Sequence, residues 1–550
     1  MERMKRYIIL CAATLLICGS ASAQKDTLNA VVQVENSYNP TVARAAKISS
    51  TPQVEIQSNS TPLDIIFSQK AQPFRQFVSE RNVKESMPAQ QEQFPGYARI
   101  GYGTNNNVDT KILYRIAPTK RNLLELQGSL EGYNTTLDGI NKEWDSRFYS
   151  TNIVARYMHK LRPFNIGVEA RVRDNVFNYQ TENFFGGETD KQNSASYSLH
   201  TYIKSNNTGA LSYSANAGYA MNTRKYSAAK EERITESHIS VGGNIEYELP
   251  NNDIRRLGAD VTIDGFLYNG NMRPDTGNKY SSYAAIGLNP YIDFHFDYWK
   301  IRLGMNSDIM TANGTFISFA PDCNIEGAIN KNVTLFASAT GGRTPISLAA
   351  LEALSPYWLY TPGDAQYASA YNIADLNIGA RFSLSPLSGS ISAGYSYTKD
   401  DLLPCLAVYD LAGTQFAQAT SRNLYATAAV GYDYGGWLKF AADARYNHWS
   451  CTGNDLYLLY KPMVQANLKA EARLYDGVYA TAVYTFTGYT KADGIRNEEM
   501  NALNARISYR FHRQMAAYIQ GNNLLNSEHQ LYPGCEAQGT NVIGGVSINF

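Results

Sequence analysis

Polar and apolar side chains alternate along residues 97–550, and this alternation restricts the possible folds more than any other feature of the sequence. In one segment, Lys439 and Arg445 share one face and Phe440 lies on the other, as the period of 2 in a β-strand requires. Charges on alternate positions would be costly in a sealed core, but they suit a strand between water and lipid. The pattern is clear in four segments: Ile166–Asn175, Ile239–Leu249, Trp437–Asn447 and Leu503–Phe511. It predicts an all-β protein, a large closed antiparallel transmembrane β-barrel.

The connections between the predicted strands are of two alternating kinds. Short polar turns are expected at 118–121, 205–209, 250–253, 330–332, 386–389 and 476–477. Longer links are expected near 134–146, 179–193, 268–279, 342–369, 401–421 and 526–539. Bacterial barrels have short periplasmic turns and long outer loops, and this alternation gives about 22 strands, an even number. A series of β-sandwich domains is the alternative, but no linker interrupts residues 97–550.

The composition agrees with a barrel and excludes other classes. The chain has 40 Tyr against 21 Phe and 5 Trp, and tyrosine suits a sheet that faces two solvents. A mean hydropathy of -0.35 excludes a polytopic helical membrane protein. The 49 basic and 49 acidic residues balance, which removes the electrostatic argument for nucleic acid as a partner. Trp299 and Trp437 lie beside predicted periplasmic turns, where an aromatic girdle would meet the lipid interface, although ordinary strand packing also explains them.

The N-terminal part of the chain carries no barrel pattern. Residues 1–23 are predicted to be a cleaved signal peptide, with a basic start, a short apolar core and the small residues Ala21-Ser22-Ala23. Ile17 disfavours lipid attachment at Cys18. Residues 24–95 are rich in Pro, Gln and Ser and are expected to form a periplasmic or lumenal segment. Residues 96–550 form the predicted barrel. Export and a barrel together predict the outer membrane of a Gram-negative bacterium, with its lipid as a partner.

The residue types of catalytic and metal sites are scattered. No HExxH, GxSxG or Walker-type motif is present, so no enzyme activity, cofactor or metal is predicted. His448 with Ser450 is the nearest pair to a catalytic one, and it lacks a third orienting group. Cys405 and Cys451 are expected on neighbouring outer loops, where a disulfide is possible; Cys535 is a competing partner, and free thiols are the alternative.

Two stretches carry a family resemblance. Gly521-Asn522-Asn523-Leu524-Leu525-Asn526 precedes a loop and a last strand Asn541–Phe550, and Gly341-Gly342-Arg343-Thr344-Pro345 precedes a long link. Both resemble the β-barrel of TonB-dependent outer-membrane receptors. The alternating Val546, Ile548 and Phe550 resemble the C-terminal signal that the barrel-assembly machinery reads.

The resemblance implies a receptor-type transport barrel, and one feature departs from it. A plug domain of that family is much longer than residues 24–95, which number 72 and contain six prolines. We therefore expect a plug-less or plug-reduced variant whose lumen is partly closed by residues 24–95 and by the 342–369 loop. The segment Asp26–Val32 is vaguely similar to a TonB-contacting box, and energy coupling stays open.

Two functions are compatible with these features. The first is solute uptake, with Tyr357, Trp358, Tyr360 and Tyr367 as candidate ligand-contacting residues of the outer loop. The alternative role of these aromatic residues is to pack the loop onto the barrel rim, which the helical spacing of leucines at 348, 351 and 354 favours. The second function is an anchoring barrel for a surface or periplasmic partner such as a lipoprotein, without transport of its own.

Overall fold

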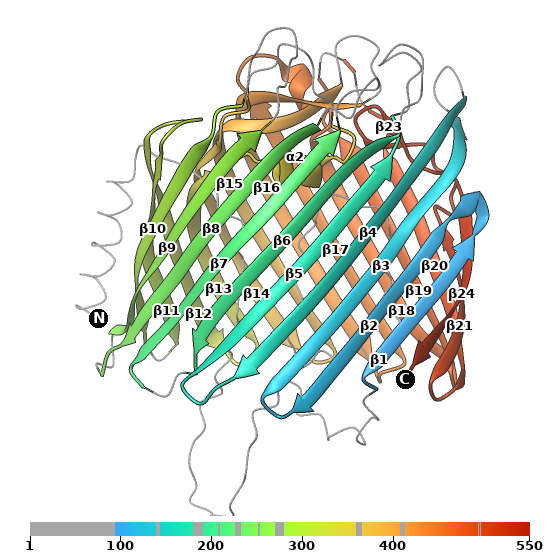
Figure 1. The fold of residues 1–550 in the computed structure, drawn as a ribbon, viewed down its shortest axis with the longest axis horizontal. Helices are drawn as coiled ribbons and strands as arrows, with labels where there is room; N and C mark the ends of the chain where they lie inside the picture. The colour runs from blue at the N-terminus through green and yellow to red at the C-terminus, as the bar shows by residue number, and fades with distance from the viewer. Residues whose placement is uncertain are drawn as a thin grey trace, which may run out of the picture.

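The computed structural model describes residues 94–138, 143–179, 191–206, 209–225, 233–250, 254–269, 280–296, 298–358, 366–406, 413–492, 494–495 and 497–550. These residues form a closed antiparallel barrel of 22 strands, shown in Figure 1 with its strands tilted to the barrel axis. The predicted fold class and strand number are confirmed. Among the described residues, no helix is long and apolar enough to cross a membrane.

The strands follow one another around the wall in chain order. The barrel strands are β1 (Gly96–Gly103), β2 (Val108–Thr119), β3 (Asn122–Asp138), β4 (Glu143–Lys160), β5 (Phe164–Phe177), β6 (Gln192–Ser205), β7 (Leu211–Lys225), β8 (Arg233–Glu248), β9 (Ile254–Asn269), β10 (Tyr283–His295), β11 (Trp299–Met310), β12 (Ile317–Asn330), β13 (Val333–Thr344), β14 (Ala370–Leu384), β15 (Leu387–Leu406), β16 (Thr414–Tyr434), β17 (Leu438–Cys451), β18 (Pro462–Tyr475), β19 (Val478–Tyr489), β20 (Met500–His512), β21 (Met515–Asn522) and β24 (Asn541–Asn549). The remaining elements are the helix α2 (Leu348–Leu354), the 3₁₀ turns η1 (Thr104–Asn106) and η2 (Asp455–Leu458), and the hairpin β22 (Gln530–Tyr532) and β23 (Cys535–Glu536).

The barrel closes where its first and last strands meet. β1 pairs with β24 as well as with β2. The backbone N–H of Gly96 donates to the carbonyl oxygen of Phe550 at 2.7 Å, and Phe550 returns a bond to Gly96 at 2.9 Å. The Phe550 ring lies over Gly96 and stacks on Tyr114 with the ring centroids 5.9 Å apart. Every barrel strand therefore has two neighbours, which removes the unpaired edges of an open sheet.

The two faces of the wall differ as the alternation predicts. On β20, Ile507 is 50% exposed on the outer face, whereas Arg506 is 2% exposed on the inner face. On β24 and directly after it, the three residues of the C-terminal signal point outward, whereas Ser547 points inward and is buried. The outer surface is apolar and suits lipid, and the inner surface is polar.

The connections at the two ends of the barrel also differ. The strand ends that flank the six predicted short turns lie at one end, together with both chain ends of the barrel, and we call this end the short-turn rim. The opposite end is the long-loop rim. Trp299 and Trp437 lie beside turns of the short-turn rim and are partly exposed, as expected for an aromatic girdle.

One predicted link is shorter than expected. The 401–421 segment is mostly strand, because β15 continues to Leu406 and β16 begins at Thr414. These extensions bury Leu402 and Phe416 in a cluster with the neighbouring Leu348 of α2, and this packing stabilises the strands beyond the lipid-facing part. Cys405 consequently lies in a strand and not in a loop.

Candidate functional site

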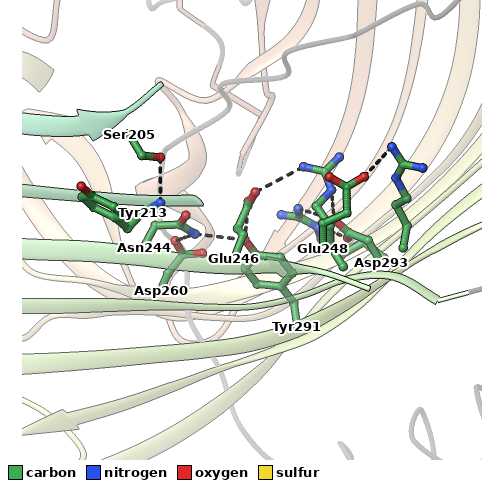
Figure 2. A network of polar contacts seen from close by, with 11 residues as sticks. Ser205, Tyr213, Asn244, Glu246, Glu248, Asp260, Tyr291 and Asp293 are labelled. Carbon is green, nitrogen blue, oxygen red and sulfur yellow. Dashed lines mark hydrogen bonds and ion pairs between the residues drawn. The ribbon is translucent and has the colours of Figure 1, made fainter. Parts of the chain in front are cut away.

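The inner wall is lined by polar groups that are bonded to one another. Figure 2 shows one such network on β8 to β11, near the short-turn rim. The amide of Asn244 donates to Asp260 at 2.8 Å and to the Tyr291 hydroxyl at 3.0 Å, and that hydroxyl donates to Glu246 at 2.6 Å. Because the partners are mutually satisfied, the wall keeps its polar side chains in place while facing water.

Tyr291 lies flat against the wall in this network. Its cross-strand partners are Gly258 on β9 and Gly304 on β11, and a Cβ at Gly258 would come within 2.2 Å of the Tyr291 ring. The Arg302 guanidinium covers the other face of the ring, 4.0 Å from its centroid, and forms two hydrogen bonds to Asp293, at 2.8 and 3.1 Å. Gly258 thus leaves room for an aromatic ring that covers the backbone of β9, and Gly304 leaves room for the Tyr291 Cβ atom.

The described part of the connection between β13 and β14 crosses part of the lumen near the long-loop rim. We call residues 345–358 the strap. The strap contains α2, which appears inside the outline of the barrel in Figure 1. Ser347 caps the helix, since its hydroxyl accepts a hydrogen bond from the backbone N–H of Ala350 at 3.1 Å. Leu348 and Leu351 are buried, whereas Leu354 is exposed, so the predicted amphipathic turn is present.

An ion pair fixes the strap to the inner wall formed by β5 to β8. Glu352 of α2 pairs with Arg224 of β7, and its other oxygen accepts a hydrogen bond from Asn175 of β5 at 3.1 Å. The Arg224 guanidinium also donates to the carbonyl oxygen of Trp358 at 2.8 Å and lies 4.6 Å from the centroid of the Trp358 ring. The Tyr179 hydroxyl accepts from Arg224 at 2.9 Å. One arginine therefore holds both the helix and the end of the strap.

A second attachment lies at the beginning of α2. The carboxylate of Glu236 on β8 accepts a hydrogen bond from the backbone N–H of Leu348 at 2.7 Å and another from Asn222 at 3.0 Å. The Tyr283 hydroxyl of β10 donates to the carbonyl oxygen of Ile346 at 3.1 Å. The strap leaves the wall at β13 and reaches strands from β5 to β10, so it spans part of the lumen.

The other end of the strap joins two further parts of the barrel. Tyr357 packs in an aromatic cluster with Phe177 and Tyr532, at ring-centroid distances of 5.3 and 5.9 Å. Cys535 is buried in the same cluster, where desolvation raises the pKa of its thiol well above its ordinary value. The backbone N–H of Thr414, the first residue of β16, donates to the carbonyl oxygen of Tyr357 at 3.1 Å. The strap therefore connects the β5–β10 wall, β16 and the β22–β23 hairpin.

The four candidate ligand-contacting aromatic residues have different positions. Tyr357 and Trp358 are 3% and 2% exposed, so their rings hold the strap and are not open to a ligand in this conformation. Tyr367 packs edge-on against Phe416, with the ring centroids 6.1 Å apart. Tyr360 lies outside the described residues. The positions of Tyr357, Trp358 and Tyr367 agree with the interpretation that these aromatic residues pack the loop onto the barrel rim.

The structure does not bring Cys405 and Cys451 together. Cys405 pairs with Gln415 and Cys451 with Ser421, on opposite sides of β16. Six residues separate these partners, which corresponds to about 20 Å along the strand, whereas a disulfide needs Cα atoms less than about 7 Å apart. Both cysteines end up in strands because β15 and β17 extend toward the long-loop rim.

The residues that anchor the strap were not found from the sequence. Arg224, Glu236 and Glu352 are far apart in the chain. For two of them the sequence held a signal, because the strand alternation places Arg224 and Glu236 on the inner face near the long-loop ends of their strands. For Glu352 the sequence held no such signal beyond its place in a short predicted helix. Among the described residues, no group of three or more His, Cys, Asp or Glu side chains could hold a metal ion.

The chain matches no protein-family model, and no curated protein matches it. Solved structures match its fold. They include the FrpB iron transporter from Neisseria meningitidis, with 11% identity, a TM-score of 0.65 and coverage of 84% of this chain and 82% of that one. The siderophore receptor PirA from Acinetobacter baumannii has 10% identity, a TM-score of 0.63 and coverage of 83% and 80%. The copper transporter OprC has 14% identity, a TM-score of 0.62 and coverage of 83% and 80%.

These similarities define a class of fold. The chain has the 22-stranded barrel fold of TonB-dependent receptors, as the resemblance implied. At these identities the comparison concerns the barrel architecture alone.

Proposed function

We propose that this protein is an outer-membrane transport barrel of the TonB-dependent receptor type, which takes a solute across the outer membrane of a Gram-negative bacterium. The observation that carries the proposal is the polar inner wall of a 22-stranded barrel, because such a barrel is too wide for its own side chains to fill. The solved structures with the same fold include transporters and a receptor, which supports the same function.

The strap gives this barrel a closed resting state. An open pore of this width would admit harmful solutes, and the strap blocks part of the lumen at the end that we assign to the cell exterior. We propose that the chain carries no complete plug of its own and that residues 24–95 contribute to closure from the other end. The residues before Phe94 lie outside the described part of the chain.

The proposed partners follow from this function. The exposed Val546, Ile548 and Phe550 would be read by the barrel-assembly machinery during insertion. TonB, through residues such as Asp26–Val32, or a lipoprotein at one of the rims, would supply energy or substrate. No catalytic role is proposed for the barrel.

Replacement of residues 346–357 by a Gly-Ser linker tests the transport function. We expect cells that produce this variant to admit vancomycin and to hydrolyse nitrocefin faster, because the outer end of the lumen is opened. The matched control replaces residues 455–458, the η2 turn, with a linker of the same length. If a correctly inserted strapless barrel that also lacks residues 24–90 leaves permeability unchanged, the transport proposal fails. A partner protein that co-purifies in stoichiometric amounts would then support the anchoring function.

A further inference from the structure

A small cavity lies between α2 and the inner wall formed by β5, β6 and β7. Its volume is about 50 Å³, and its lining includes Arg173, Ser194, Ser196, Asn222 and Arg224. Two guanidinium groups, two hydroxyl groups and a side-chain amide therefore face one space, which the Glu352 carboxylate also lines. These are the groups that recognise the oxygen atoms of a carboxylate or a phosphate.

Arg173 is the arginine of this lining that forms no ion pair with another described residue. Among the described residues, its guanidinium has no hydrogen bond, ion pair or ring contact. Its neighbour on the same face of β5, Arg171, pairs with Glu169 at 2.9 Å. A partly buried cation without a counter-charge is costly, and an anion in the cavity would offset that cost.

The strap already demonstrates which chemistry this lining accepts. The carboxylate of Glu352 lines the cavity and contacts Arg224, Asn175 and the indole nitrogen of Trp358, the last at 3.3 Å. One internal carboxylate uses Arg224, which leaves Arg173 for a second one. The cavity is much smaller than the several hundred Å³ of a pocket that encloses a whole ligand, so it suits only an anionic end group.

We infer that this cavity binds a carboxylate or phosphate group of a solute in the lumen, with Arg173 as its main counter-charge. The bound anion would lie beside Glu352 and repel it, which weakens the hold of Arg224 on the strap. An anionic solute would thereby favour opening of the strap. This inference goes beyond the proposed function, because anion binding at the cavity does not depend on transport.

Quenching of Trp358 fluorescence tests the inference on the purified full-length protein in detergent. Iodide is the anionic probe and acrylamide the neutral one, and subtraction of the W358F signal isolates Trp358. Loss of one charge-assisted hydrogen bond corresponds to about tenfold in affinity. We therefore expect R173Q to lower iodide quenching of Trp358 at least threefold, which is less than the full loss of about tenfold in affinity. Acrylamide quenching and the gel mobility of the folded barrel should stay unchanged.

R171Q is the matched control, because it removes a paired arginine from the same face of the same strand. It should leave iodide quenching as in the parent protein. At constant ionic strength, acetate or inorganic phosphate should reduce iodide quenching in the parent, and the stronger competitor identifies the preferred end group. Equal iodide quenching in R173Q and the parent, or no competition by either anion, would overturn the inference. Neither result depends on uptake, so the transport proposal stands or fails separately.

Discussion

Neutralising Glu352 should release the strap without unfolding the barrel. The side chains of Arg224 and Glu352 are 5% and 13% exposed, so E352Q removes one charge from a buried pair. Loss of a charged hydrogen bond costs about 1.5 kcal/mol, and breaking a buried pair costs about 3 kcal/mol or more. Since about 1.4 kcal/mol changes an equilibrium tenfold, the open fraction of the strap should rise roughly tenfold to hundredfold.

A buried thiol reports this opening. Ser355 is fully buried at the end of α2, and S355C in a barrel without its native cysteines places a thiol where a maleimide reacts only after the strap opens. The labelling rate then follows the open fraction. We expect the labelling rate in E352Q to exceed the parent rate by about tenfold or more. This lower bound of about tenfold corresponds to the free energy of one charged hydrogen bond.

E326Q is the control for the loss of a carboxylate elsewhere on the inner wall. Glu326 pairs with Arg381 at 2.9 Å, but both side chains are partly exposed, and such pairs contribute about 1 kcal/mol at most. E326Q should therefore label at close to the parent rate. If E352Q labels no faster than E326Q, the ion pair does not hold the strap and the reasoning is wrong.

Three further predictions concern the barrel and its thiols. Maleimide should modify Cys535 far more slowly in the folded protein than in urea, because the thiol is buried and its pKa is raised; equal rates would contradict its position in the aromatic cluster. Non-reducing peptide mapping should find no link between Cys405 and Cys451, and recovery of a bridged peptide would show that the β16 register differs in the cell. G258A should lower the free energy of unfolding in urea by about 1–3 kcal/mol because its methyl group meets the Tyr291 ring, whereas G265A, with open space around it, should stay within about 0.5 kcal/mol. Equal midpoints for the two glycine variants would refute the role given to Tyr291.

The barrel was predictable because the pattern that produces it is present within each short segment of the sequence. A wall that separates lipid from water imposes the same choice on every second residue, so segments such as Trp437–Asn447 show their orientation without reference to any partner. The turns were predictable for the same reason, since short polar turns and long links alternate along the chain. The first two strands, β1 and β2, lie at the start of the alternating region, where closure of the barrel requires strands.

The strap contacts were not predictable because they join residues that are far apart in the sequence. Glu352 and Arg224 are 128 positions apart, and no periodicity relates a helix in the lumen to a strand on the facing wall. The sequence left two roles open for Tyr357 and Trp358, since exposure of an aromatic ring depends on what packs over it. The strand extension through Cys405 was missed because it depends on packing against α2 and not on a pattern within β15.

The closure between Gly96 and Phe550 has a consequence for the timing of biogenesis. The last strand completes the pairing of the first, so the ribosome must finish the chain before the circle can form. A chain that stops anywhere short of β24 keeps two unsatisfied strand edges, which are templates for aggregation. For the proposed outer-membrane location, the complete polypeptide would have to reach the membrane before its barrel closes. The exposed edges of a chain without β24 would therefore distinguish it from the closed barrel.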